Sequence, residues 1–229
     1  MAIPRIKLKK GEALVLRTSD RDGKSYNDFM WPKKGKVEAP DWKPTATCGN
    51  GLHGLLHGVG SRSYLNWEDA AWIVVKVIES ECIWIDGNKV KFPRGEVVYF
   101  GDRFEAVALI TEHAPAGSVI VCGTATAGDS GTATAGDSGT ATAGVSGTAT
   151  AGVRGTATAG VCGTATAGDR GTATAGYRGT ATAGDRGILN IRWWDRKRYR
   201  ISVFYVGENK IKPNTAYRVN LKGEFEEVK

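Results

Sequence analysis

The chain has 229 residues, 41% hydrophobic content and a net charge of +7, enough for one globular domain beside a repetitive segment. No apolar run long enough for a transmembrane helix and no signal-peptide segment is visible, so we expect a cytoplasmic protein without membrane contact. The four cysteines are Cys48, Cys82, Cys122 and Cys162. Their wide spacing excludes a disulfide framework.

Residues 1–116 are not repetitive and predict a small α+β head domain. The apolar runs predict strands at 11–17, 72–78, 82–86, 89–92 and 96–100, with a tight turn at 86–88. A short helix is expected at 66–71, and a longer one from the N-cap Asp102 to about residue 112. The apolar stripe of the longer helix is predicted to be Phe104, Val107, Ala108 and Ile110.

The head also contains a glycine-rich motif, Cys48-Gly-Asn-Gly-Leu-His53-Gly-Leu-Leu-His57. Cys48, His53 and His57 form a candidate head site. They could ligate a metal, but the glycines oppose a helix and no fourth ligand is apparent. We therefore expect no metal, and favour a tight glycine-rich loop whose histidines form local hydrogen bonds.

Residues 123–186 repeat Gly-Thr-Ala-Thr-Ala-Gly-x-x eight times. Alternating Thr and Ala has strand periodicity, and Gly-x-x-Gly is turn chemistry in which glycine would supply positive φ. Eight residues are too few for a closed coil, so two copies should make one. The sequence predicts a β-solenoid over 117–187 with about four sixteen-residue coils. Alanine should point inward, because burying unpartnered threonine hydroxyls costs about 1–3 kcal/mol each.

This register defines two groups of candidate binding residues on the solenoid. Outward threonines form the faces: Thr124, Thr126, Thr140, Thr142, Thr156, Thr158, Thr172 and Thr174. At the eighth position of the repeat, every second copy stacks, so Arg154, Arg170 and Arg186 should form a column along one edge. We expect this edge to be a solvated corner with weak charge pairs; the alternative is a self-association or partner surface.

Residues 188–229 predict a β-hairpin cap. Strands are expected at 188–194, 199–206, 211–219 and 224–228, and bulky side chains should close the solenoid: Trp193, Trp194, Phe204 and Tyr205. The turn at 195–198 carries Arg196, Lys197 and Arg198. Cations mixed with aromatic residues can bind nucleic acid, but such a turn more often only exposes its basic tip.

Three resemblances follow from these motifs. Residues 174–182 resemble the Ala-Gly-Tyr-Gly-Ser-Thr-x-Thr repeats of bacterial ice nucleation proteins, and outward Thr-x-Thr ladders also occur in insect antifreeze solenoids. The Cys48–His53 segment is weakly similar to a segment of ADP-ribosyltransferase-like folds, without an assignable catalytic residue. The chain as a whole resembles uncharacterised phage and prophage proteins on residues 48–53, the repeats and residues 207–217, which implies a viral accessory origin.

These observations favour a non-enzymatic scaffold without a cofactor. Its expected partner is a protein, such as a host defence component or a second copy of the chain, and nucleic acid is less favoured. The alternatives are an ice-binding Thr-x-Thr solenoid and an ADP-ribosyltransferase-like head.

Overall fold

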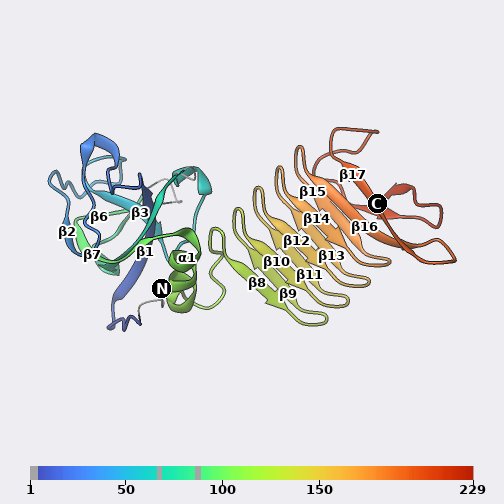
Figure 1. The fold of residues 1–229 in the computed structure, drawn as a ribbon, viewed down its shortest axis with the longest axis horizontal. Helices are drawn as coiled ribbons and strands as arrows, with labels where there is room; N and C mark the ends of the chain where they lie inside the picture. Colours follow the sequence, from blue (N-terminus) through green and yellow to red (C-terminus); the bar gives the residue numbers. More distant parts are fainter. Residues whose placement is uncertain (1–4, 66–68, 86–88, 229) are drawn as a thin grey trace. The chain divides into compact units, whose positions relative to one another are not determined.

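The computed structural model describes residues 5–65, 69–85 and 89–228. Contacts divide the chain into two units, Met1–Ile120 and Val121–Lys229, which are drawn in Figure 1. The fold is mainly β, as predicted, and in the described ranges no helix has the length and apolarity of a membrane span.

The first unit contains a seven-stranded antiparallel sheet with the order β2-β7-β4-β1-β3-β6-β5. Its strands are β1 (Glu12–Ser19), β2 (Gly35–Glu38), β3 (Leu52–Leu56), β4 (Ala71–Ile78), β5 (Ile83–Ile85), β6 (Lys89–Phe92) and β7 (Arg94–Gly101). The apolar runs predicted five of these strands. β2 and β3 were missed, because both begin among glycine and polar residues that are typical of loops.

Helix α1 (Arg103–His113) packs on β1 and β4. The side chain of Asp102 accepts a hydrogen bond from the Glu105 N–H, which confirms the predicted N-cap. The predicted apolar stripe was partly wrong, because Phe104 is 74% exposed and Ala108 is exposed. The helix buries Ala106 and Leu109 instead, next to Val107 and Ile110.

Two predictions concern residues that the structure does not describe in full. Half of the predicted helix at 66–71, residues 66–68, lies outside the described residues; Asp69 and Ala70 are not helical, and Ala71 belongs to β4. The turn predicted at 86–88 also lies outside them.

The second unit begins with eight short strands that Figure 1 shows as successive parallel rows. They are β8 (Thr124–Ala127), β9 (Thr132–Ala135), β10 (Thr140–Ala143), β11 (Thr148–Ala151), β12 (Thr156–Ala159), β13 (Thr164–Ala167), β14 (Thr172–Ala175) and β15 (Thr180–Ala183). Every strand pairs in parallel with the strand sixteen residues away, as Thr124 with Thr140 and Thr132 with Thr148. The sixteen-residue coil is therefore confirmed, and so are its two separate sheets.

Side-chain burial confirms that alanine points inward. Ala141, Ala149, Ala157 and Ala165 are fully buried, whereas all sixteen repeat threonines are exposed or partly exposed. A core this thin gains little from each methyl group. Its regularity compensates, since every coil hydrogen-bonds its backbone to the next.

The corners of the solenoid differ from the prediction that glycine supplies their positive φ. The left-handed residue is the eighth of each repeat, with φ between 54° and 60° from Ser130 to Arg186, and no repeat glycine has positive φ. Glycine is required for another reason. A Cβ on Gly160 would lie 2.7 Å from the carbonyl carbon of Gly144 in the preceding coil, so the backbones approach too closely for any side chain.

Aspartate at the seventh position links consecutive coils, which the sequence did not predict. The Asp129 carboxylate accepts a hydrogen bond from the Val145 N–H at 2.8 Å, and Asp169 accepts one from the Asp185 N–H at 2.9 Å. Each carboxylate therefore satisfies a corner amide one coil further along.

The C-terminal cap ends the parallel stacking. β16 (Ile188–Trp194) continues one sheet, and β17 (Tyr199–Tyr205) pairs with it in the antiparallel direction. The short strands β18 (Tyr217–Val219) and β19 (Phe225–Glu227) extend the other sheet from β15. Leu189, Ile191 and Tyr217 close the core with Phe204. Tyr205, which was predicted to close it, is 50% exposed because it lies on the opposite face of β17 from Phe204.

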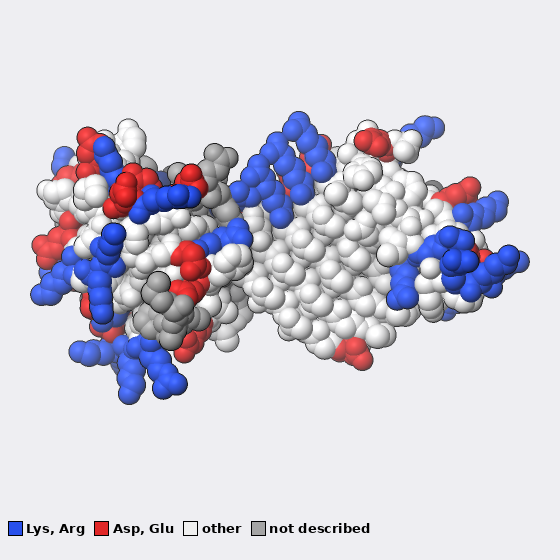
Figure 2. Space-filling view, in the orientation of Figure 1, with Lys and Arg blue, Asp and Glu red and all other residues white. Residues whose placement is uncertain are grey.

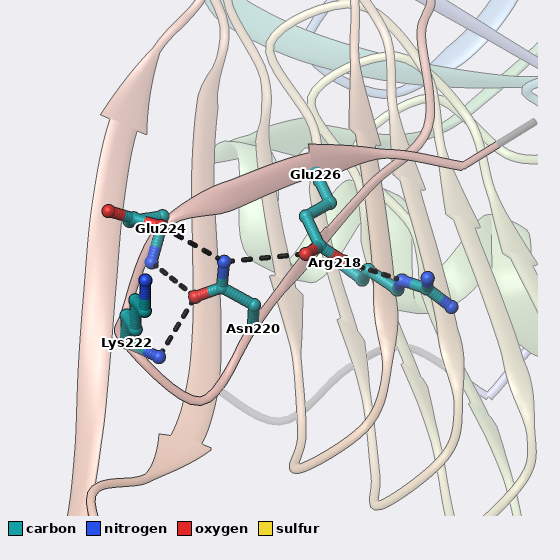
Figure 3. Close-up of polar contacts among 5 residues, drawn as sticks. All are labelled: Arg218, Asn220, Lys222, Glu224 and Glu226. Carbon is teal, nitrogen blue, oxygen red and sulfur yellow. Dashed lines mark hydrogen bonds and ion pairs between the residues drawn. The ribbon is translucent and has the colours of Figure 1, made fainter.

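The hairpin between β18 and β19 is held by one asparagine (Figure 3). The side-chain oxygen of Asn220 accepts hydrogen bonds from the N–H groups of Lys222 and Glu224, at 2.9 and 3.1 Å. Its amide nitrogen donates to the carboxylates of Glu224 and Glu226, and Glu226 also pairs with Arg218. The strand that was predicted over 211–219 is shorter in the structure, because Pro213 and Asn214 form a turn and only the three residues of β18 are extended into a strand.

Candidate functional site

The solenoid carries the candidate threonine faces. Thr124, Thr140, Thr156 and Thr172 stand in register on one sheet, and Thr132, Thr148, Thr164 and Thr180 on the other. The two threonines of one strand lie about 7 Å apart, and neighbouring coils about 4.8 Å apart. Figure 2 shows that the face turned to the viewer carries no charged side chain over the repeats. In both sheets the repeat strands contain only threonine and alanine, so each sheet presents a periodic array of hydroxyl and methyl groups.

An edge with charged corners borders this array, and Figure 2 shows a row of cationic side chains there with acidic side chains among them, since Asp169 and Asp185 stand beside Arg170 and Arg186. The Arg154 N–H donates to the carbonyl of Asp169, and the Arg170 N–H donates to that of Asp185, which stacks these corners in one column. Among the described residues only Arg186 of the column has an ion pair in the structure, with Asp185 at 3.3 Å. The column therefore offers exposed cations at regular intervals.

The basic turn between β16 and β17 is ordered by Asp195. Its carboxylate accepts hydrogen bonds from the N–H groups of Arg198 and Lys197, and these lower the pKa of Asp195 to about 2. The side chains of Arg196, Lys197 and Arg198 are exposed. Asp195 remains ionised near neutral pH and offsets part of their charge.

A second candidate site is a cavity of about 400 Å³ in the head. Cys48 and His53 line it, as do Arg17, Tyr26 and Lys89. Strand alternation places Arg17 on the face of β1 that carries Ala13 and Val15. On the neighbouring strand β3, Gly54 lies beside Arg17; a Cβ there would lie 2.3 Å from Val15, so glycine leaves space at the wall of the cavity.

Arg17 is the most unusual residue of the cavity. Its guanidinium lies over the Trp31 ring, with Cζ 3.9 Å from the ring centroid, and donates to the backbone carbonyls of His53 and Thr18. Its Nε is buried and has no hydrogen-bond partner among the described residues. Burial lowers the pKa of Arg17 to about 9, so it stays charged at neutral pH, and no carboxylate of the described residues forms an ion pair with it.

His53 is held neutral in this setting. Burial, and after it the positive charges of Lys89, Arg17 and Lys91, lower its pKa to about 4. The Gly49 N–H donates to its Nε2 at 3.3 Å, so this nitrogen is unprotonated. His53 therefore acts as a hydrogen-bonding group rather than as a cation near neutral pH.

A buried lysine supports the loop that carries Cys48. Lys91 is fully buried, and its ammonium donates to the Thr45 hydroxyl and to the carbonyls of Thr47 and Gly49. Lys89, two residues earlier, contacts the Cys48 thiol at 3.2 Å. The favoured glycine-rich loop is thus present at residues 48–51, but β3 follows it where the loop was expected to continue.

The structure does not unite the three residues of the predicted head site. His57 lies outside the cavity lining and contacts Glu79 at 3.5 Å. The described ranges hold no group of three or more His, Cys, Asp or Glu side chains placed to bind a metal. An ADP-ribosyltransferase-like head would need a cleft beside His53, which exists, but no glutamate is found among the described residues that line it.

Comparisons with known proteins give one family model and several relatives. The model of a domain of unknown function, DUF7666, matches residues 13–111. Ice nucleation proteins are similar to the chain: InaU of Pantoea ananas at 37% identity over 123 residues, and a Pseudomonas syringae protein at 41% over 102 residues. These matches cover 53% and 44% of this chain but only 12% and 9% of the relatives. No solved structure matches significantly.

The structure and these relatives agree on the repeat block. It is a β-solenoid that resembles ice nucleation proteins, and its architecture is that of a repeat scaffold.

Proposed function

We propose that the chain is a non-enzymatic binding scaffold whose threonine faces bind the ordered water of an ice surface. The observation that carries this proposal is the unbroken register of the threonines on two flat, uncharged faces. A periodic array of hydroxyl and methyl groups can hold water at fixed spacings, much as a crystal face does. With about four coils, the array is about 19 Å long. Because such a small surface templates only a small patch of ice, we expect it to bind and shape ice crystals rather than to nucleate freezing.

Thermal hysteresis and ice-crystal shaping test this proposal. We expect both effects to be measurable for the full chain. The double substitution Thr142→Tyr/Thr158→Tyr should abolish most of the thermal hysteresis that the sheet containing these residues produces. Thr150→Tyr/Thr166→Tyr makes the same change on the opposite sheet and shows whether both faces act. Val145→Tyr is the matched control, because it adds the same ring at an exposed corner. Val145 is the seventh residue of its repeat, and another repeat has a tyrosine, Tyr177, at this position. A wild-type chain without hysteresis at high concentration would refute the proposal.

A second role is supported by the arginine column. We propose that Arg154, Arg170 and Arg186 bind an acidic surface of another protein or of a second copy of the chain. The resemblance to phage and prophage proteins suggests a host protein, such as a defence component, in the cytoplasm of an infected cell. Regularly spaced, exposed cations favour such electrostatic recognition and accelerate association.

The test replaces the three arginines by serine, which already occupies the same left-handed corner position at Ser130, Ser138 and Ser146. We expect the triple variant to lose self-association in light scattering, or capture of a purified host partner. Serine substitutions at Arg196, Lys197 and Arg198 remove the same charge from the basic turn and should leave binding intact. If both variants bound equally well, the arginine column would not be the binding surface.

A further inference from the structure

We propose that the head cavity binds a mononucleotide, with its phosphate at Arg17 and Lys89 and its base against Tyr26. This site is separate from the threonine faces and does not depend on the role proposed for them. It rests on the charge, the aromatic rim and the size of the cavity.

The cavity has an excess of positive charge. Arg17 and Lys89 line it, and neither is paired with a carboxylate in the described part of the chain. Asp41 is the one acidic residue among the described lining residues, and it accepts a hydrogen bond from Asn50. A buried cation without a counterion is unfavourable. A bound phosphate would supply the missing negative charge and acceptor atoms for these donors.

Aromatic side chains flank the same cavity. Tyr26 is 90% exposed and Tyr64 is 39% exposed, which is unusual for rings of this size. Tyr26 is carried by a short turn in which Asn27 and Asp28 both have left-handed φ, 57° and 59°. Asn and Asp adopt this left-handed conformation more readily than other residues, so the turn needs no glycine. A flat, exposed ring beside a phosphate-binding cation matches the two ends of a nucleotide.

The volume limits the size of the ligand. Small-molecule sites span about 300–1,000 Å³, and this cavity, at about 400 Å³, lies at the small end. It therefore suits one nucleotide better than a dinucleotide. The glycines at 49 and 51, with φ of 94° and 152°, allow the backbone of the Cys48 loop to follow the cavity wall closely.

Calorimetric titration of the full chain with AMP, adenosine and inorganic phosphate tests the assignment. We expect saturable binding of AMP, with adenosine and phosphate each at least about tenfold weaker, since each lacks one of the two contacts. Binding should also weaken as salt rises. Phosphate that binds as tightly as AMP would reduce the site to a simple anion site, and equal binding of adenosine would remove the phosphate contact; either result overturns the proposal, as does the absence of any nucleotide binding.

Two variants locate the site. Lys89→Gln removes one of the two phosphate contacts and Tyr26→Ser removes the stacking ring, and each should weaken AMP binding about tenfold. Tyr26 is so exposed that its substitution leaves the fold intact. Lys36→Gln is the matched control, since it removes one charge from the exposed surface of β2 away from the cavity. If both site variants bind AMP like the control, the nucleotide does not occupy this cavity.

Discussion

Gly160→Ala is expected to be one of the most damaging single substitutions in the solenoid, although it adds one methyl group. The new Cβ would lie 2.7 Å from the carbonyl carbon and oxygen of Gly144. These are backbone atoms of the preceding coil and cannot rotate away as a side chain can. Overpacking typically costs about 1–3 kcal/mol, and we expect the upper part of this range because two coils must separate.

Gly128→Ala is the matched control for this prediction. Gly128 occupies the same repeat position in the first coil, where a Cβ would meet no atom within 4 Å. We expect it to be neutral, or to stabilise by up to about 1 kcal/mol through the lower entropy of the unfolded chain. Hydrogen exchange of the solenoid amides measures both variants independently of the head. If the two variants were equally stable, close approach of the coils would not explain the glycine.

Ala149→Leu should have a comparable effect from inside the solenoid. Ala149 is fully buried between the two sheets, where neighbouring coils contribute only alanine to the core. A leucine side chain has no space there, so we expect a loss of about 1–3 kcal/mol or more, as the sheets are forced apart.

Thr148→Leu tests the outward face of the same strand, β11. Thr148 is partly exposed, so we expect a change in the free energy of unfolding within about 0.5 kcal/mol, together with stronger retention on a hydrophobic column. Urea unfolding followed by hydrogen exchange ranks the two variants. A more destabilising Thr148→Leu would contradict the inward orientation of alanine.

The solenoid was predictable because the octapeptide period determines the position of each strand, the length of the coil and the orientation of the side chains. A strict octapeptide with alternating Thr and Ala leaves few arrangements open, and Thr124 pairs with Thr140 as expected. The conformation of the corners was not predictable in the same way. Glycine tolerates positive φ, but the structure places that strain on Ser130 and its equivalents, because the glycines are needed where the coils meet.

The head was less predictable because its important residues resemble ordinary strand residues. Cys48 and His53 stand out in a glycine-rich motif, and both line the cavity. Arg17 follows an apolar run and ends the strand predicted at 11–17, and nothing in the local sequence indicates that its guanidinium lies over Trp31. The sequence did contain one indication that Arg17 is buried: strand alternation places it on the same face as the apolar residues Ala13 and Val15. His57 lies outside the cavity because β3 separates it from His53. The glycines around β3 made this strand unpredictable from the sequence.

The two-repeat coil also constrains how such a gene can change in length. Unequal recombination between repeats adds or removes whole octapeptides, and the protein distinguishes odd from even changes. Adding or losing two copies changes the rod by one coil and leaves every later residue on its original edge. Losing one copy between Arg154 and Arg170 would transfer Arg170 and Arg186 to the opposite edge and divide the basic column. Selection on that edge would therefore act on the parity of the copy number rather than on length alone.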